Sequence, residues 1–472
     1  MIMKKPFVHI FANSNGKYVY DVNSDNIFKI SEESYQILEN GDEYNEQLSY
    51  LEQMGFLKED KVKITEHPAG AILTEFYKNQ LQGLTLQVTQ NCNLRCDYCV
   101  YSGKYNTRIH SNKVMSFEMA RKGIDYLFEH SGKTDILRIG FYGGEPLLEF
   151  ELIKRCVEYI EEKSDKKHMN YYITTNATLL TSEVVEFLVK YKFLLTISFD
   201  GLKEIHDSQR KYANSGKGSF DTVVKRLEYL YQNYYEYYIE KVNINMVLNQ
   251  GNRYKPVSDF MKSEMIFREA SITATLISNT GVKKENEVSS KFKEEYYYEY
   301  FKLLLSALGR VKRINVSPLM RTEFKTLQSI RGGKHRQGIG KLPEKWHHGG
   351  PCIPGERTLF LNAEGYIYPC ERVCELSEEA KVGNVESGVD IEKARTILNV
   401  EEVTCAICKN CWAYRYCDFC IRMAGNETES IQKNIKMACE NMRKATENIF
   451  KDYCVLRELG YDFETNYVKE YV

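Results

Sequence analysis

Three closely spaced cysteines, Cys92, Cys96 and Cys99, are the residues of this sequence whose type and spacing best suit chemistry. Cysteine thiolates bind iron–sulfur clusters, and three of them can hold three irons of a [4Fe–4S] cube while the fourth iron stays open. An open iron can chelate a small amino acid through its amine and its carboxylate. A tetrahedral zinc site would need a fourth Cys or His nearby, and none follows within this loop. The spacing therefore favours an open iron–sulfur cluster over a zinc knuckle.

The elements around this loop predict an α/β fold. Apolar, strand-like segments occur at 84–89, 136–142, 170–175, 193–199, 242–248 and 271–277. Amphipathic helices are expected between them, near 117–130, 147–162, 181–191, 219–236 and 254–265. Six alternating strand–helix units imply a parallel sheet. In barrels of such units the chemistry sits at the C-terminal ends of the strands, which is where the cysteine loop follows the first strand.

Residues suited to binding a small polar molecule stand on the later strands or just after them. They are Gly143, Gly144, Glu145, Thr175, Asn176, Ser198, Asp200, Arg210 and Asn245. Paired glycines let the backbone come close to a ligand, and the Glu and Arg side chains can make charge-assisted bonds. Asn176 and Asp200 are also typical of turns and helix caps, so both interpretations stay open for them.

The cysteine loop, followed by Gly143-Gly144-Glu145-Pro146 at the end of the second strand, resembles the radical S-adenosylmethionine (SAM) superfamily. The resemblance implies an open, six-unit partial TIM barrel over residues 82–278, with SAM bound at a [4Fe–4S] cluster on Cys92, Cys96 and Cys99. It implies that the glycine turn holds the methionine amine and that Tyr98 packs against the adenine, although a loop tyrosine can also be plain packing. The resemblance further implies contacts to the ribose or the SAM carboxylate from Thr175, Asn176, Ser198, Asp200 and Arg210, and to the adenine or ribose from Asn245.

A second set of cysteines follows between residues 352 and 439. Cys352, Gly365 and Cys370 have the spacing C-x12-G-x4-C, and Cys408, Cys411 and Cys417 have the spacing C-x2-C-x5-C. Clustered pairs of this kind in a cytosolic chain indicate metal ligands rather than disulfides. The pattern resembles the SPASM domain, which carries two auxiliary [4Fe–4S] clusters, giving three clusters in all. The resemblance assigns Cys352, Cys370 and Cys420 to the first auxiliary cluster, and Cys408, Cys411, Cys417 and Cys439 to the second.

This second set departs from the usual pattern in two ways. Only two residues separate Cys417 from Cys420 where three are usual, which puts the ligand role of Cys420 in doubt. No cysteine stands in residues 345–351, so the first auxiliary cluster is expected to have an open iron unless another side chain completes it. Alternative ligands are Cys374, Cys405, His347 and His348, and a zinc site at 405–420 is a further alternative.

The rest of the chain divides into smaller units. Residues 1–75 predict three strands followed by helices around 32–40 and 44–55, which resembles a winged-helix leader-binding domain; a generic α+β cap is the alternative. Residues 279–347 are expected to be a helical and irregular bridge, 348–440 the SPASM domain, and 441–472 a C-terminal helix. Cys156 and Cys454 lie in expected helices and are interpreted as buried apolar residues.

Composition limits where such a protein works. The formal net charge is −1, so neither nucleic acid nor an anionic membrane is an expected partner. No apolar run is as long as a membrane span, and the first residues lack the apolar core of a signal peptide. A cytoplasmic protein is therefore expected.

The combination of units resembles the thioether-forming maturases of ribosomally synthesised peptides, of the sactipeptide and ranthipeptide type. That resemblance implies a Cys-to-carbon crosslink made through a 5′-deoxyadenosyl radical. The implied partners are a cysteine-containing precursor peptide with a leader and an electron donor such as flavodoxin or ferredoxin.

Two alternatives stay open, and only the second belongs to another class of protein. An anaerobic sulfatase-maturing enzyme would carry a base right after the cysteine matching Cys370, where Glu371 stands; the 91 residues before Cys92 speak against that enzyme. Glu371 is the candidate base in either case, unless it is an ordinary surface glutamate. A binding scaffold with structural or redox-sensing clusters is the non-enzymatic alternative.

Overall fold

A mixed sheet of ten strands organises the computed structural model, which describes residues 5–59, 61–105, 107–164, 167–278, 282–283, 286–328, 341–348, 352–400, 405–424 and 428–463. Six strands are mutually parallel and lie side by side in the order β12-β11-β9-β8-β7-β5. Their bounds are β5 Gly83–Thr89, β7 Ile136–Gly143, β8 His168–Thr175, β9 Leu194–Ser198, β11 Val242–Leu248 and β12 Ser271–Leu276. The α/β class and the six predicted strands are thus confirmed.

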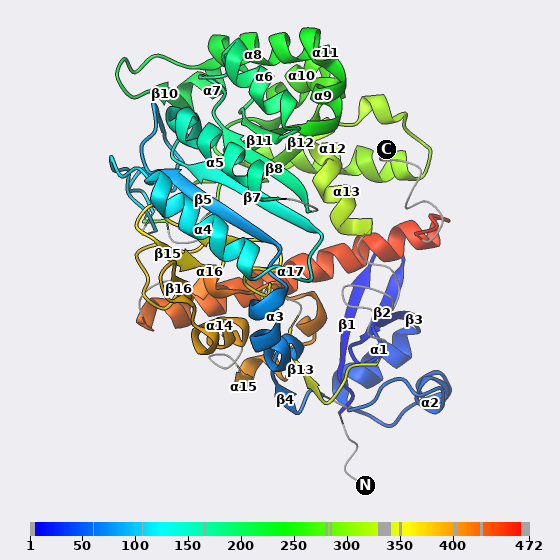
Figure 1. Cartoon of the computed structure of the whole chain (residues 1–472). Helices are drawn as coiled ribbons and strands as arrows, with labels where there is room; N and C mark the ends of the chain where they lie inside the picture. Colours follow the sequence, from blue (N-terminus) through cyan, green and yellow to red (C-terminus); the bar gives the residue numbers. More distant parts are fainter. Residues whose placement is uncertain are drawn as a thin grey trace.

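Helices connect these strands, and two of them, α4 and α6, begin at a side chain that caps the first turn. They are α4 Phe117–Glu129, α5 Phe150–Lys163, α6 Ser182–Lys190, α7 Lys203–Gln209, α8 Phe220–Asn233, α9 Tyr235–Lys241, α10 Tyr254–Ser263 and α11 Met265–Glu269. Ser116 and Thr181 accept hydrogen bonds from the backbone N–H groups of Met119 and Val184, as N-cap residues do. Helices α4 and α5 lie over the sheet in Figure 1. The helix expected to reach residue 236 ends at Asn233, and α9 follows it.

The C-terminal half extends the sheet, which the sequence did not predict. Strand β14 (Leu359–Leu361) pairs in parallel with β5, and β15 (Tyr366–Tyr368), β16 (Gly383–Asn384) and β17 (Gly388–Val389) continue in antiparallel order. All seven residues of β5 are buried. An unpaired edge on so apolar a strand would leave backbone groups without partners, and β14 supplies those partners.

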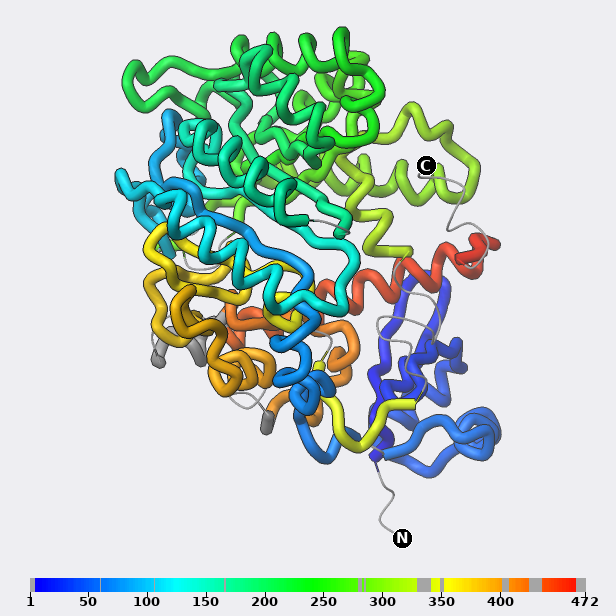
Figure 2. The backbone as a smooth tube through the Cα atoms, viewed as in Figure 1, coloured from blue at the N-terminus to red at the C-terminus, as the bar shows by residue number. Residues whose placement is uncertain are grey.

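Residues near the N-terminus form a three-stranded antiparallel sheet with two helices. These elements are β1 Val8–Asn13, β2 Gly16–Asp21, β3 Asn26–Ile30, α1 Glu32–Asn40 and α2 Glu46–Gln53, so the strands and helices expected here are present. One face of the sheet packs with Leu48 and Leu51 of α2. The other joins the main core beside α17 (Thr428–Glu458), as Figures 1 and 2 show.

The remaining elements connect these parts. They are β4 Ile64–Thr65, α3 Leu73–Asn79, β6 Leu94–Cys96, β10 Arg210–Tyr212, α12 Ser290–Ala307, α13 Arg321–Gln328, β13 Lys345–Trp346, α14 Ile391–Leu398, α15 Cys405–Cys408 and α16 Ile421–Ala424. The helix expected from residue 441 begins earlier, at Thr428, and carries Cys439. Cys156 and Cys454 are fully buried, as predicted. In the described part of the chain, no helix is both long and apolar enough to cross a membrane.

Candidate functional site

The first cysteine loop is fixed in place by a short antiparallel ladder. Strand β6 lies inside the loop and pairs with β10, so that Cys96 is opposite Arg210. Cys92, Cys96 and Cys99 are free, half-buried thiols. Burial raises the pKa of the Cys92 and Cys96 thiols to about 12 each, and it also raises that of Cys99. The loop therefore holds three thiols just after the end of β5.

The glycine turn after β7 packs against the backbone that leads into this loop. A Cβ atom on Gly143 would lie 2.0 Å from the carbonyl oxygen of Thr89, and one on Gly144 would lie 2.1 Å from that of Asn91. The Gly144 N–H donates to the Thr89 carbonyl at 3.0 Å, and the Glu145 N–H donates to the Asn91 carbonyl at 2.9 Å. The two glycines were expected to let a ligand come close, but in the structure it is the chain's own backbone, at Thr89 and Asn91, that lies against them.

Glu145 is buried and its carboxylate is surrounded by donors. It accepts hydrogen bonds from the Thr175 hydroxyl at 2.7 Å, the Asn176 N–H at 2.7 Å and the Leu147 N–H at 3.1 Å. Burial raises its pKa to about 7, although these hydrogen bonds act in the opposite direction. The end of β8 is therefore tied to the glycine turn through one carboxylate.

Asn176 connects the end of β8 to the cysteine loop. Its side-chain Nδ2 donates to the Asn93 Oδ1 at 2.8 Å and approaches the Cys92 sulfur at 3.8 Å. Its Oδ1 accepts from the Thr178 N–H at 3.0 Å, which is the turn-forming contact expected of an asparagine. The turn interpretation of Asn176 thus has a contact in the structure, and its contact to SAM stays a prediction.

Asp200 and Arg210 form a fully buried ion pair at the same end of the sheet. Arg210 Nε lies 2.9 Å from Asp200 Oδ2, and the Tyr98 hydroxyl donates to the same oxygen at 2.5 Å. The Arg210 guanidinium lies 5.4 Å from the centre of the Tyr98 ring and reaches the Cys96 sulfur at 3.9 Å. Arg210 therefore already has a carboxylate partner within the chain, and Tyr98 packs on Arg210. Their contacts to SAM stay predictions.

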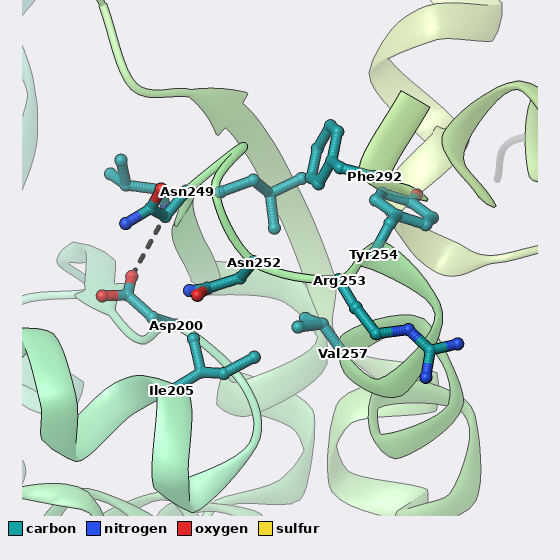
Figure 3. Close-up of a pocket in the computed structure, with 10 residues that line it drawn as sticks. Asp200, Ile205, Asn249, Asn252, Arg253, Tyr254, Val257 and Phe292 are labelled. Carbon is teal, nitrogen blue, oxygen red and sulfur yellow. Dashed lines mark hydrogen bonds between the residues drawn. The ribbon is translucent and has the colours of Figure 1, made fainter. Parts of the chain in front are cut away.

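A small pocket lies beyond the ends of β9 and β11 (Figure 3). Of the predicted site residues, Asp200 lines it and accepts a hydrogen bond from the Val247 N–H at 3.3 Å. Asn249 and Asn252 add polar groups to its wall. Ser198 and Asn245 pair across β9 and β11 nearby and are half-buried.

Some cysteines of the second set affect one another's pKa within each of the two predicted groups, and their roles as cluster ligands stay predictions. Burial and the nearby Glu371 and Cys420 thiol raise the pKa of Cys370 to about 11, and burial together with Cys352 raises that of Cys420. In the other group, burial and the thiols of Cys411 and Cys439 raise the pKa of Cys417 to about 12. Cys408 lies one helical turn before Cys411, whose N–H donates to the Cys408 carbonyl at 2.9 Å.

The alternative ligands differ from one another in their surroundings. His347 and His348 are buried beside one another, with ring centres 4.1 Å apart, and burial lowers the pKa of His348 to about 3. The Cys374 thiol lies 3.6 Å from the Thr107 carbonyl. The side chain of Cys405 lies outside the described residues.

These donor sets consist of thiols and are chemically suited to iron–sulfur clusters. Among the described residues, no three His, Cys, Asp or Glu side chains gather closely enough to hold one ion. A [4Fe–4S] cube is wider than one ion, and thiolates are its usual ligands. Binding to metal deprotonates a coordinating thiol, which overcomes the raised pKa values of these buried cysteines.

A buried network links the sheet to the second set, and only part of it had a signal in the sequence. Arg108 forms an ion pair with Glu375, and both side chains are buried. Gln87 of β5 donates to the Glu375 carboxylate at 2.8 Å, and Arg108 Nη2 donates to the carbonyl of Glu371. Gln87 was a detectable signal, because it is a polar residue in an apolar strand. The Glu371 side chain is half-buried and lies 3.5 Å from Arg372.

Comparisons with known proteins identify a family model, relatives and a solved structure that are similar to this chain. The family model described as the radical SAM superfamily matches residues 86–263. An uncharacterised protein of Methanocaldococcus jannaschii is 34% identical over 49% of this chain and 72% of its own length. A cysteine-type anaerobic sulfatase-maturating enzyme of Clostridium novyi is 26% identical over 81% of this chain and 98% of its own length. A solved structure of native anSMEcpe with bound AdoMet and Cp18Cys peptide has a TM-score of 0.56 and 20% identity, covering 80% of this chain and 99% of that one.

The family match spans the cysteine loop, the glycine turn, and the strands β8 and β9 with Asn176 and Asp200 just after them. The chain belongs to the radical SAM superfamily.

Proposed function

We propose that this enzyme installs Cys-to-carbon thioether crosslinks in a ribosomally synthesised precursor peptide. Superfamily membership implies SAM and a [4Fe–4S] cluster, which together supply a carbon radical that removes a hydrogen atom from the substrate. The Cp18Cys peptide in the anSMEcpe structure supports a peptide as the substrate class. An electron donor such as flavodoxin or ferredoxin is part of the proposal.

The site residues have distinct tasks in this proposal. Cys92, Cys96 and Cys99 hold the SAM cluster, and Glu145 faces the amine of SAM. Asn176 orients the loop, since it touches both Asn93 and the Cys92 sulfur. The buried residues around the cysteine loop, such as Glu145, Asp200 and Arg210, exclude water from the reacting atoms. Further binding contacts are proposed for Tyr98, Gly143, Gly144, Thr175, Ser198, Asp200, Arg210 and Asn245.

The single observation that carries the thioether assignment is the first group of the second cysteine set. The Cys420 thiol helps to raise the pKa of Cys370, Cys352 helps to raise the pKa of Cys420, and Cys352 is exposed. Three thiolates would leave one iron of a cube open to a cysteine thiolate of the peptide. Crosslinking removes one hydrogen from the thiol and one from carbon; a cluster held by these cysteines would supply an acceptor for the extra electron, and Glu371 accepts the proton.

The proposal also covers the architecture. The six parallel strands form the partial barrel, and residues 348–440 form a SPASM domain with two auxiliary clusters, the second held by Cys408, Cys411, Cys417 and Cys439. Residues 1–75 are a winged-helix-like domain that recognises the leader, 279–347 a bridge and 441–472 a C-terminal helix.

A second candidate is formylglycine formation, as in anaerobic sulfatase maturation. It is favoured by the Clostridium novyi relative, which this chain covers over nearly the relative's full length. Glu371 would again be the base, because it directly follows Cys370.

One anaerobic experiment separates the two chemistries. The reconstituted enzyme, SAM and a reductant are incubated with a cysteine-containing precursor peptide, and the product is treated with a thiol alkylator and a hydrazide probe. Thioether formation predicts a loss of about two hydrogens per crosslink, with sulfur retained and no longer alkylated. Loss of sulfur with hydrazide labelling would instead indicate formylglycine. Crosslinks in a cysteine-free peptide would contradict the proposal.

A further inference from the structure

The loop between Cys411 and Cys417 is held by the N-terminal unit, defined here as residues 7–59. The His9 ring of β1 stacks on Trp412 with ring centres 3.7 Å apart and an interplanar angle of 4°. Arg415 donates through Nε to the Val22 carbonyl at 2.7 Å and through Nη2 to the Asn23 carbonyl at 2.6 Å. The loop thus meets this unit through both a stacked ring and directed hydrogen bonds.

The turn that receives these bonds contains a buried residue with an uncommon backbone conformation. Asp25 is buried and adopts the left-handed conformation, with φ of 60°, which few residues other than glycine adopt. Its Oδ1 accepts the Tyr416 hydroxyl at 3.0 Å and the Tyr20 hydroxyl at 2.8 Å. A strained backbone persists where surrounding contacts determine it, and here those contacts include the cysteine loop.

The same unit also holds the helix that carries the last cysteine of the group. His9 Nε2 lies 3.0 Å from the Glu447 carboxylate of α17. Glu447 follows Cys439 by about two helical turns, and Phe450, one turn further, packs on Tyr20. His9 therefore contacts both segments that bring Cys411, Cys417 and Cys439 together. In Figure 2 the dark blue N-terminal unit lies directly against the red helix α17.

We propose that the N-terminal unit positions the second auxiliary cluster, with His9, Asp25 and Tyr416 as positioning residues. The inference rests on the ligand roles proposed above for Cys411, Cys417 and Cys439. A cap that only covered apolar surface would need no hydrogen bonds to a loop between two cysteines. Outer-shell contacts of this kind fix ligand orientation, and their loss commonly weakens metal binding by about 10- to 100-fold.

The test isolates this cluster in the full chain. A parent with Cys92, Cys96, Cys99 and Cys370 changed to Ala retains the second group of ligands. His9→Val keeps a strand-forming residue but removes the stack and the Glu447 contact, and Tyr416→Phe removes one hydroxyl. The matched control Lys29→Met removes a 3.0 Å ion pair between the same unit and Glu458, far along α17 from Cys439.

Iron and sulfide per chain, the electron paramagnetic resonance signal after reduction, and the rate of iron loss to a chelator are measured. His9→Val combined with Tyr416→Phe should lose iron about tenfold faster than the parent, while Lys29→Met should match the parent. Tyr416→Phe alone, a conservative change, gives the answer in the same direction if the double variant does not fold by circular dichroism. Equal rates in parent and variants would overturn the inference while leaving the ligand assignment intact. A parent without a cluster would overturn both.

Discussion

Replacing Gly144 by Ala tests whether the glycine turn supports the cysteine loop or only the ligand. The new Cβ atom would lie 2.1 Å from the Asn91 carbonyl oxygen, whereas real Cβ atoms essentially never come within 3.0 Å of another heavy atom. The Asn91 backbone must therefore move by about 0.9 Å, the difference between these two distances. Asn91 directly precedes Cys92, so the first cluster ligand should move with it.

A displacement of this size has a large expected effect on rate. A misplacement of about 1 Å can cost about 100-fold in turnover, so we expect SAM cleavage by the Gly144→Ala enzyme to be slowed by about that factor. Iron at the first cluster should also fall before any SAM is added, because the ligand itself moves. Reductant-driven SAM cleavage and iron per chain are the two measurements, made on a variant in which Cys352 and Cys408 are changed to Ala so that the first cluster dominates.

Gly132→Ala is the matched control. Its Cβ atom would have its nearest neighbour at 3.5 Å, an ordinary contact, so iron content and cleavage should match the parent. Unchanged iron in the Gly144→Ala protein, with only a weaker affinity for SAM, would refute the reasoning. The glycine would then serve the ligand and not the loop.

Three further predictions concern ionisable side chains. Glu375→Gln leaves the Arg108 charge buried without its partner, so the apo protein should lose about 3–5 kcal/mol of unfolding free energy in urea; an unchanged value would contradict the role of this pair. Burial lowers the pKa of His206 from 6.5 to about 4, so its contribution to stability is complete above pH 6.5 and falls by about 1.4 kcal/mol per pH unit toward pH 4. His206→Gln should reduce that slope in urea titrations at pH 5 and 7, and an unaltered slope would exclude His206 as its source. Glu371→Gln should slow peptide modification by about 100-fold with SAM cleavage retained, measured by mass spectrometry; full modification would remove Glu371 as the base.

Local features of the fold were predictable because their causes lie within a few residues. The strands and their polar ends follow from apolar runs interrupted by Gly143 or Asn176. The glycine turn was recognised, but its reason was incomplete, since Thr89 and Asn91 fill the space next to the two glycines. Contacts made by neighbouring backbone cannot be read from a motif that ends at Pro146.

Long-range contacts were not predictable in the same way. Strand β14 is only three residues long, and its pairing with β5 depends on the edge that β5 leaves rather than on its own sequence. Arg108 stands in a loop with no pattern to distinguish it, yet it reaches Glu375, which is more than 260 residues away. The stack of His9 on Trp412 is of the same kind. Such pairs are chosen by packing, and a single sequence does not reveal them.

The N-terminal sheet limits how a peptide can bind to it. Val19 faces the core shared with α1 and α2, and Tyr18 faces α17, where its hydroxyl donates to Glu458 at 2.7 Å. With both faces covered, an extended peptide would add to an edge strand through main-chain hydrogen bonds. The edge strands are β1 and β3. A peptide on β1 would lie beside His9 and the second cysteine group, whereas one on β3 would act on that group only through the sheet. A generic cap would use neither edge strand for binding. Hydrogen exchange measured with and without a leader peptide therefore distinguishes the two roles: protection of one edge strand indicates leader recognition, and protection of neither indicates a generic cap.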